Sequence, residues 1–179
     1  MKEIILGGTG GQGVLTAGTM IAEMAIYKGL NATWSPEYGS AMRGGTASCV
    51  VKFGEDRIYC TEKEEADILL AMNDETLLKF GKNIKEGGTV IYNSDLVTVP
   101  DDFRKDVRTI PVPCMSLAEE IQHKKGANII MSGVIVRETG AFSLEEATDG
   151  MNDTFKRKGK EKFEALNTKA LKLGYDYKA

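Results

Sequence analysis

The sequence predicts an α/β fold, a three-layer α/β/α arrangement around a mixed, mostly parallel β-sheet. Two observations lead to this class. Short apolar runs alternate with helical patterns along the first two thirds of the chain, and glycines gather directly after the first run. The composition agrees, because 42% hydrophobic and 27% charged residues are typical of a folded globular chain. With 179 residues the chain has the length of one domain, and we expect residues 1–179 to form one.

The first three elements are expected to be a strand, a helix and a strand. Residues 2–6 form an apolar run that ends in glycine, and residues 31–35 form the next strand-like run. Between them Gly29 stands where a helix carboxyl cap belongs. Four apolar residues share one face of this helix: Ala17, Ile21, Met24 and Ala25. Residues 2–35 therefore predict a parallel crossover unit with a Rossmann-like start.

A loop and a hairpin are expected next. Residues 35–46 are rich in glycine and turn residues without an apolar period, and loops of this length in compact domains are often functional. Residues 47–53 and 57–60 are β-rich and flank Gly54-Glu55-Asp56, which favours a hairpin. The sheet should therefore contain an antiparallel element.

Strands and helices then alternate again. Residues 66–72 indicate a buried central strand, and Asn73 or Asp74 can cap a helix that ends near Phe80. Two further strands are expected, at residues 89–92 after the Gly87-Gly88 turn and at residues 107–112, where Pro111 favours an edge position.

The last third is expected to be helical. Two sequence pairs match the capping box, in which each side chain satisfies the other residue's free amide: Ser116 with Glu119, and Ser143 with Glu146. The apolar content of residues 128–139 indicates a third helix. Residues 160–173 place an apolar stripe on a fourth helix, which is expected to end at Gly174.

Composition and charge exclude several classes of function. The net charge of −3 argues against nucleic acid as a partner, since no basic bulk charge is available for a phosphodiester backbone. The longest apolar stretches, residues 68–72 and 129–136, fall short of the roughly 18–20 residues of a membrane span. The first apolar run is too short for a secretion signal, so we expect a cytoplasmic protein. Three cysteines without Cys-x-x-Cys spacing predict buried reduced thiols and neither an iron–sulfur cluster nor a zinc site.

The strongest motif is a glycine loop, Gly8-Thr9-Gly10-Gly11-Gln12-Gly13, which lies between a predicted strand and a predicted helix. Glycines let the backbone approach an anion, and the helix amino terminus favours a phosphate. A dinucleotide site would also need an acidic residue at the end of the second strand, but Ser35 stands there and Glu37 lies beyond Pro36. The alternative is that these glycines only allow tight packing between strand and helix.

A second motif, Glu37-Tyr38-Gly39-Ser40-Ala41-Met42-Arg43-Gly44-Gly45, contains another candidate binding residue. Arg43 offers a planar, bidentate donor for a carboxylate or a phosphate. It could equally pair with Glu37 and fix the loop. Tyr38 and Met42 could form an apolar contact surface for another chain.

Neither His123 nor the basic stretch near the carboxyl end predicts a catalytic set. His123 is the sole histidine and precedes two lysines at an expected helix end, so it indicates an exposed cationic cap. Residues 156–172 carry an excess of lysine and arginine over glutamate. Such a face is usually solvated, although it could dock an acidic partner.

Taken together, these motifs resemble the gamma subunit of 2-oxoacid:ferredoxin oxidoreductases. The resemblance is carried by the glycine loop continuing into Val14 and by five further segments. These are Tyr38-Gly39, Arg43-Gly44-Gly45, Ala71-Met72-Asn73, the turn from Lys85 to Gly88 with the following Ile91-Tyr92-Asn93-Ser94, and Gly126-Ala127-Asn128 to Gly133.

The resemblance implies a subunit of a complex that oxidatively decarboxylates a 2-oxoacid with coenzyme A, giving acyl-CoA, carbon dioxide and reduced ferredoxin. Thiamine diphosphate, Mg²⁺ and iron–sulfur clusters would lie in partner alpha and beta subunits or in a delta subunit, so this chain would hold no cofactor alone and be inactive in isolation. It implies no catalytic or metal residues here. Gly8, Gly10, Gly11, Gln12, Gly13 and Arg43 become candidates for contacts to coenzyme A phosphates or to other subunits.

Two other hypotheses remain open at this point. The chain could be the smaller subunit of an indolepyruvate ferredoxin oxidoreductase, which is similar in this domain and depends on one larger partner. It could also be a free-standing nucleotide-binding oxidoreductase, as the glycine loop alone would suggest. The particular 2-oxoacid, among pyruvate, branched-chain and 2-oxoglutarate forms, is not determined by these residues.

Overall fold

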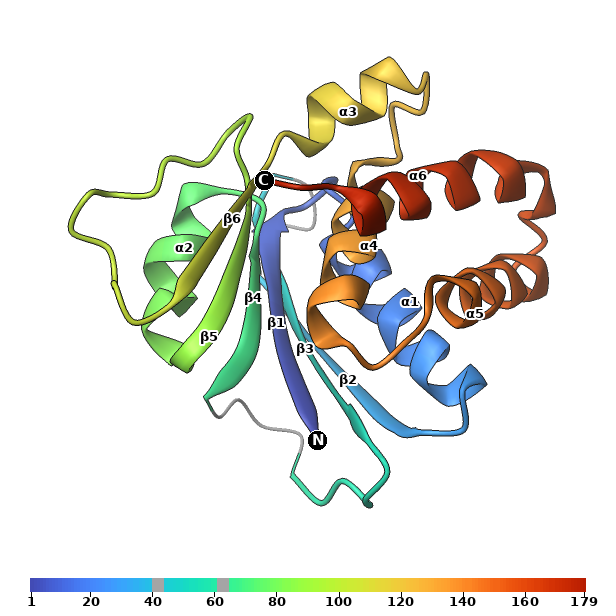
Figure 1. Cartoon of the computed structure of the whole chain (residues 1–179), viewed down its shortest axis with the longest axis horizontal. Coiled ribbons are helices and arrows are strands. Elements are labelled where there is room, and N and C mark those ends of the chain that lie inside the picture. Colours follow the sequence, from blue (N-terminus) through green and yellow to red (C-terminus); the bar gives the residue numbers. More distant parts are fainter. Residues whose placement is uncertain (40–43, 61–64) are drawn as a thin grey trace.

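The computed structural model describes residues 1–39, 44–60 and 65–179. Their centre is a six-stranded sheet in the order β2-β3-β1-β4-β5-β6 (Figure 1). The strands are β1 (Lys2–Thr9), β2 (Asn31–Tyr38), β3 (Thr46–Gly54), β4 (Ala66–Ala71), β5 (Ile84–Asn93) and β6 (Arg108–Val112). The α-helices are α1 (Val14–Tyr27), α2 (Asp74–Phe80), α3 (Cys114–Glu120), α4 (Ala127–Thr139), α5 (Leu144–Arg157) and α6 (Glu164–Asp176), with short 3-10 turns η1 (Gly81–Asn83) and η2 (Glu161–Phe163).

The sheet is mixed, as the sequence predicts. Strand β1 pairs in parallel with β4, β4 with β5, and β5 with β6, whereas β3 runs antiparallel to both β1 and β2. The expected hairpin between residues 47–53 and 57–60 is wrong, because residues 57–60 form no strand. Instead β3 pairs with β2 over an eight-residue ladder, which satisfies more backbone groups than a four-residue partner could.

The expected parallel crossover is present, but its two strands are not neighbours. Because β3 is antiparallel to both β1 and β2, the strands β1 and β2 run parallel on either side of it. The strand after α1 therefore lies two strand spacings, roughly 9–10 Å, from β1. The Rossmann-like start is thus altered by an inserted strand.

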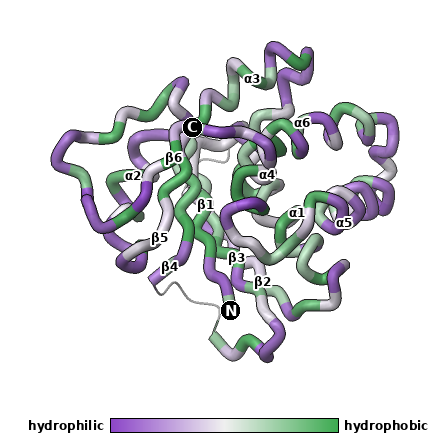
Figure 2. Tube along the Cα trace, in the orientation of Figure 1, coloured by the Kyte–Doolittle hydropathy of each residue, from purple (hydrophilic) through white to green (hydrophobic). Residues whose placement is uncertain are grey.

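Helices cover both faces of the sheet, so the three-layer α/β/α prediction is confirmed. Ile4 and Leu6 of β1 face the larger core, which contains α1, α4, α5 and α6, and Ile5 faces the smaller core under α2. Figure 1 shows α2 on one side of the strands and α1, α4, α5 and α6 on the opposite side. Figure 2 shows hydrophobic stretches in the central strands β1 and β4 and hydrophilic residues along α5. Among the described residues no helix is both long and apolar enough to cross a membrane.

Three predicted boundaries differ in the structure: the start of α3, the start of β5 and the end of α6. The Ser143–Glu146 capping box is confirmed at the start of α5, but α3 begins at Cys114, so Ser116 lies inside the helix and is not its N-cap. The carboxylate of Asp95 instead accepts hydrogen bonds from the Ser116 amide and hydroxyl, at 3.2 and 2.6 Å. Strand β5 begins at Ile84, before the two glycines, and α6 continues through Gly174 to Asp176.

Candidate functional site

The candidate site lies at the edge of the sheet where the parallel strands end. The loop after β1 holds the glycine motif, and the segments after β4, β5 and β6 meet it at the same edge. In α/β sheets this carboxyl edge is where ligands usually bind. Asn73 ties two of these segments together, because its amide donates to Thr9 Oγ1 at 2.8 Å while its carbonyl oxygen caps α2 at Thr76.

Gly8 and Gln12 stabilise the conformation of the glycine loop through contacts within the protein. A Cβ at Gly8 would lie 2.5 Å from Gln12 Oε1 and 2.8 Å from Met72 Cβ, so only glycine fits between the loop and the end of β4. The Gln12 side chain accepts a hydrogen bond from the Thr9 amide at 2.7 Å and donates one to the Met72 carbonyl at 3.1 Å. Both residues therefore hold the loop in shape.

Gly11 and Gly13 face different surroundings, although both have backbone angles that disfavour a side chain. Their φ angles are +108° and +76°. A Cβ at Gly11 would meet no atom of the described residues within 4 Å, so its backbone borders open space. At Gly13 a Cβ would lie 2.7 Å from Asn128 Nδ2, which donates to the Gly13 carbonyl at 3.1 Å. Gly13 thus lets α4 approach the loop, and Gly11 leaves room for a ligand.

The amino terminus of α1 follows directly and presents free donors. Gly13 is its N-cap residue, and its first turn contains no acidic residue. Within the described residues the amides of Val14, Leu15 and Thr16 donate no hydrogen bond. Unpaired amides and the helix dipole make such an end attractive to an anion.

The two sequence motifs meet in space. The Gly10 amide donates to the Gly45 carbonyl at 2.8 Å, and Thr9 is paired with Thr46 in the sheet register. The glycine loop is therefore joined to the second motif at Gly45, just before β3. Tyr38, at the end of β2, is 58% exposed beside it. Arg43, the sequence's candidate anion ligand, lies outside the described residues.

A cavity of about 720 Å³ opens beside the glycine loop. It lies between this loop, the segment joining α3 to α4, and the carboxyl-terminal helices α5 and α6. Three lysines line it, Lys124, Lys125 and Lys160, and its apolar lining includes Met72, Phe155 and Phe163. A basic, partly aromatic cavity next to free helix amides has the character of a site for an anionic organic ligand.

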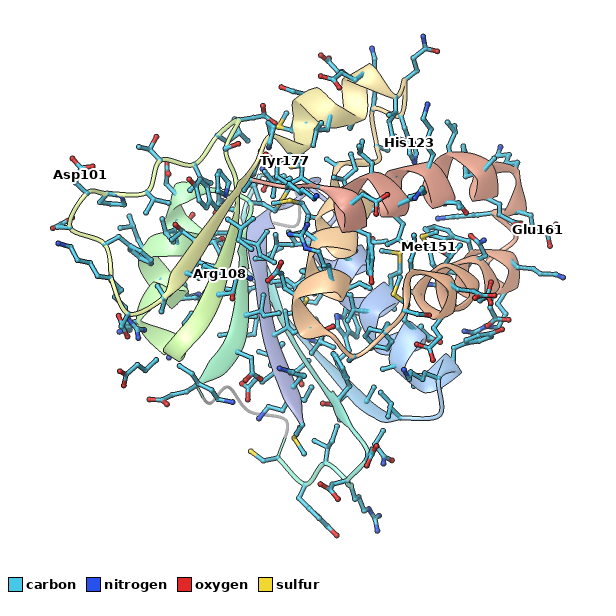
Figure 3. All side chains as sticks on the ribbon, in the orientation of Figure 1. Asp101, Arg108, His123, Met151, Glu161 and Tyr177 are labelled. Carbon is cyan, nitrogen blue, oxygen red and sulfur yellow. The ribbon has the colours of Figure 1, made fainter. Side chains whose placement is uncertain are left out.

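His123 belongs to this cavity rather than to an exposed helix end, which corrects the sequence interpretation. It follows α3 by three residues, is half-buried, and places Nε2 2.9 Å from Oδ1 of Asn167. Asn167 lies on α6 and is only 2% exposed. Figure 3 shows His123 beside α6. The pair closes one wall of the cavity, and no pattern in the sequence links these two positions.

The thiols do not form a metal or cluster site. The prediction of buried thiols is confirmed for Cys49 and Cys114 and is wrong for Cys60, which is exposed. Burial, followed by the nearby Asp95 carboxylate, raises the pKa of the Cys114 thiol from 9.0 to about 12, so it stays protonated at neutral pH. Across the described residues no three His, Cys, Asp or Glu side chains are grouped to hold a metal ion. The donors present therefore do not fit an iron–sulfur cluster.

Fold and site together define an α/β domain with a basic cavity at the carboxyl edge of a mixed sheet. The chain belongs to the pyruvate ferredoxin/flavodoxin oxidoreductase family, whose model matches residues 3–177. The family to which the sequence motifs point is thereby confirmed.

Curated relatives match the sequence of this chain over almost its full length. Ketoisovalerate oxidoreductase subunit VorA of Methanothermobacter marburgensis is 35% identical over 177 residues, which is 98% of this chain and 36% of that protein. The 2-oxoglutarate synthase subunit KorC of Methanocaldococcus jannaschii is 32% identical and is matched over 92% of its length. The chain thus spans about a third of the VorA relatives and nearly all of the KorC relative.

Solved structures agree. The gamma subunit of a keto/oxoacid ferredoxin oxidoreductase from Geobacter sulfurreducens superposes with a TM-score of 0.82 at 31% identity, covering 98% of this chain and 97% of that one. A 2-oxoglutarate:ferredoxin oxidoreductase from Magnetococcus marinus, solved with 2-oxoglutarate, coenzyme A and succinyl-CoA, gives a TM-score of 0.84 at 25% identity. This match covers 97% of this chain and 30% of that one.

Proposed function

We propose that this chain is the gamma subunit of a 2-oxoacid:ferredoxin oxidoreductase. The complex would decarboxylate a 2-oxoacid, transfer the acyl group to the thiol of coenzyme A, and pass two electrons to ferredoxin, releasing carbon dioxide. The observation that carries this proposal is the end-to-end match with the Geobacter gamma subunit, since a chain of the same extent and fold occupies that place there.

In this proposal the reactive groups lie in partner chains. Thiamine diphosphate would stabilise the acyl carbanion, with Mg²⁺ holding its diphosphate, and iron–sulfur clusters would carry the electrons. The alpha and beta subunits, or a delta subunit, would hold them, and ferredoxin would meet the chain only through the complex. The separated, mostly buried cysteines of this chain support that division of labour. We also place the complex in the cytoplasm.

The role that we propose for this chain is to bind and to position. Gly8, Gly10, Gly11, Gln12 and Gly13, with Arg43, are the candidate contacts to coenzyme A phosphates or to another subunit. The geometry divides these roles, because Gly8 and Gln12 are committed within the loop while Gly11 borders open space. Gly11 and the first amides of α1 are therefore the backbone groups best placed for a ligand.

One alternative function remains specific enough to test. The indolepyruvate oxidoreductase subunit IorB of Archaeoglobus fulgidus is 28% identical over 191 residues and covers 97% of this chain. A chain of that kind would pair with one long partner instead of separate alpha and beta subunits. A free nicotinamide-binding enzyme is disfavoured, because β3 separates β2 from β1 and moves Glu37 two strands from the glycine loop.

The experiment is co-purification of the chain from its native cell, with identification of the accompanying polypeptides and an assay of coenzyme A-dependent 2-oxoacid oxidation with a redox dye. We expect separate alpha and beta chains, activity in the complex and none in the isolated chain supplied with thiamine diphosphate and Mg²⁺. A complex rebuilt without this chain should lose activity. Turnover by the isolated chain, or a complex that oxidises no 2-oxoacid, would refute the proposal.

A further inference from the structure

We propose that the free edge of β2 is an interface with a second copy of this chain, in which the two β2 strands pair antiparallel about Ser35 and join the two sheets. The interface concerns the outer edge of the sheet, and no residue of β2 lines the cavity beside the glycine loop. It requires no cofactor and no other subunit, so it does not depend on the proposed function.

Strand β2 ends the sheet on one side and leaves half of its backbone groups unpaired. The Gly39 amide donates to the Thr46 carbonyl at 2.8 Å, in register with the ladder between β2 and β3. Because the direction of these groups alternates along an antiparallel strand, this bond shows which residues turn theirs away from β3. They are Ala32, Trp34, Pro36 and Tyr38, and to the described residues their amides and carbonyls make no hydrogen bond.

This edge is only partly protected against a further strand. Pro36 has no amide to donate, and its outward position keeps the ladder with β3 intact. Proline and charged side chains are the usual means by which an exposed edge avoids pairing. In β2 the only charged residue is Glu37, whose backbone groups face β3, and three outward amides remain. An eight-residue edge with free donors invites a partner strand.

A second copy of β2 matches this edge when the two strands run antiparallel about Ser35. Ala32 then faces Tyr38 of the other copy, and each donates its amide to the carbonyl of the other. Trp34 faces Pro36 and donates to its carbonyl. Every outward amide is thus used, and the missing donor of Pro36 leaves only the carbonyl of Trp34 unpaired. Such self-complementarity is what a two-fold interface requires.

The flank of α1 beside this edge carries exposed apolar surface. A Cβ at Gly18 would lie 3.0 Å from Nε1 of Trp34, so this side of α1 faces β2. Ala22 and Ile26 follow Gly18 at intervals of four residues and continue the same stripe. Ile26 is 54% exposed, which is unusual for a large aliphatic side chain. The stripe therefore borders the free edge with apolar groups that a second copy would cover.

The pairing places these groups against each other without collision. The exposed ring of Tyr38 reaches Ala32 of the other copy, a small residue that leaves room beside Ile26. Since α1 packs over β2 and β3, the two α1 helices come to lie about two strand spacings, roughly 10 Å, apart. Helices in proteins commonly pack at about 8–10 Å. The same pairing thus satisfies the backbone of β2 and brings the two α1 helices into contact.

The test is sedimentation velocity of the full chain over a dilution series from about 100 µM downward. We expect a dimer that dissociates on dilution. Trp34 is the sole tryptophan, so quenching of its fluorescence by acrylamide should be weaker in the dimer. Hydrogen exchange at the Ala32, Trp34 and Tyr38 amides should slow in the dimer. A monomer at every concentration, or a dimer in which these amides still exchange freely, would overturn the inference.

Variants locate the interface. Ala32→Pro removes an outward amide and spares the ladder with β3, and Ile26→Glu brings a charge into the apolar contact; each should weaken the dimer at least about tenfold. Tyr27→Glu is the matched control, because Tyr27 is 53% exposed and lies on the side of α1 that faces Gly150 of α5. Circular dichroism checks that each variant is folded. A dimer unchanged by both substitutions, or weakened equally by Tyr27→Glu, would contradict the assignment.

A strand of another subunit is the competing occupant of this edge. If the chain alone is monomeric and the three outward amides become protected only when alpha and beta subunits are added, the edge belongs to that partner and the inference is overturned. The proposed function would be unaffected by that result. A β2-paired dimer of a chain that joins no oxidoreductase complex would support the inference and refute the proposed function.

Discussion

Gln12 joins the glycine loop to the end of β4 by using both ends of its side-chain amide. Its oxygen accepts from the Thr9 amide at 2.7 Å, and its nitrogen donates to the carbonyl of Met72 at 3.1 Å. A glutamine in a phosphate-type loop would ordinarily be considered as a ligand donor. Here both polar atoms of the side chain bond backbone groups of the protein and stabilise the loop. The backbone amides of the loop stay available for other contacts.

Replacing Gln12 should therefore cost stability. Gln12→Ala removes two hydrogen bonds to backbone groups, and we expect the free energy of unfolding to fall by about 2 kcal/mol. Gln12→Glu should cost a similar amount, because a carboxylate oxygen cannot donate to the Met72 carbonyl. Chemical denaturation of the full chain measures both variants, with the exposed Thr16→Ala as control. A neutral Gln12→Glu would mean that the contact with Met72 contributes nothing.

Gly13 and Gly29 make a matched pair for measuring how tightly α4 packs on the glycine loop. Both have left-handed φ angles, +76° and +87°, but a Cβ at Gly29 meets no described atom within 4 Å while one at Gly13 meets Asn128 Nδ2. We expect Gly29→Ala to cost about 1–2 kcal/mol from backbone strain alone. Gly13→Ala should cost roughly 1–2 kcal/mol more, since Asn128 must give up its bond to the loop. If thermal denaturation shows the same loss of stability for both variants, α4 can move away from the added methyl group at no cost.

Cys114 predicts how stability changes in alkali. Its folded pKa of about 12 lies above the ordinary value of 9.0, so between these values the unfolded chain releases a proton that the folded chain keeps. Stability from this group is thus complete below pH 9 and declines above it, by up to about 1.4 kcal/mol per pH unit. Chemical denaturation from about pH 7 to 11 should show a steeper decline for the parent chain than for Cys114→Ala. Identical slopes would contradict the burial of the thiol.

Local pattern was enough to predict most elements of this fold. The helix over residues 14–27, the central strand near residues 66–71 and the cap at Asn73 all depend on residues close together in sequence. The Ser143–Glu146 box is confirmed for the same reason, since its two members satisfy each other. At Ser116 an identical pattern failed, because Asp95, 21 residues away, binds the same groups and α3 starts earlier, after Pro113.

Strand order and the cavity depended on contacts between distant segments. Nothing in residues 46–54 indicates that this strand lies between β1 and β2, since the choice rests on long-range pairing. The cavity wall also could not be predicted from local sequence. His123 and Asn167 are 44 residues apart and meet only when α6 packs beside the segment after α3. The glycine loop was predictable because its residues are contiguous and its chemistry belongs to the backbone.

Packing of α6 on α4 leads to the last prediction, which connects the core to the cavity. Gly133 of α4 and Gly174 of α6 lie where the two helices touch, and a Cβ on either would overlap a backbone carbonyl of the other helix, at Leu171 and Ile130. Gly133→Ala should therefore cost at least about 2 kcal/mol of unfolding free energy and push α6 outward. Under the proposed contact between the glycine loop and coenzyme A, this variant should also weaken coenzyme A binding, because Asn167 on α6 lines the cavity beside that loop.

Two measurements separate these effects of Gly133→Ala. Thermal denaturation gives the loss of stability, and titration with coenzyme A at a temperature where the variant is fully folded gives the loss of affinity. Lys169→Ala, on the outer side of α6, should change neither. A Gly133→Ala chain that is destabilised but binds coenzyme A as the parent does would show that α4 takes up the added methyl group and that the position of Asn167 is independent of this helix contact.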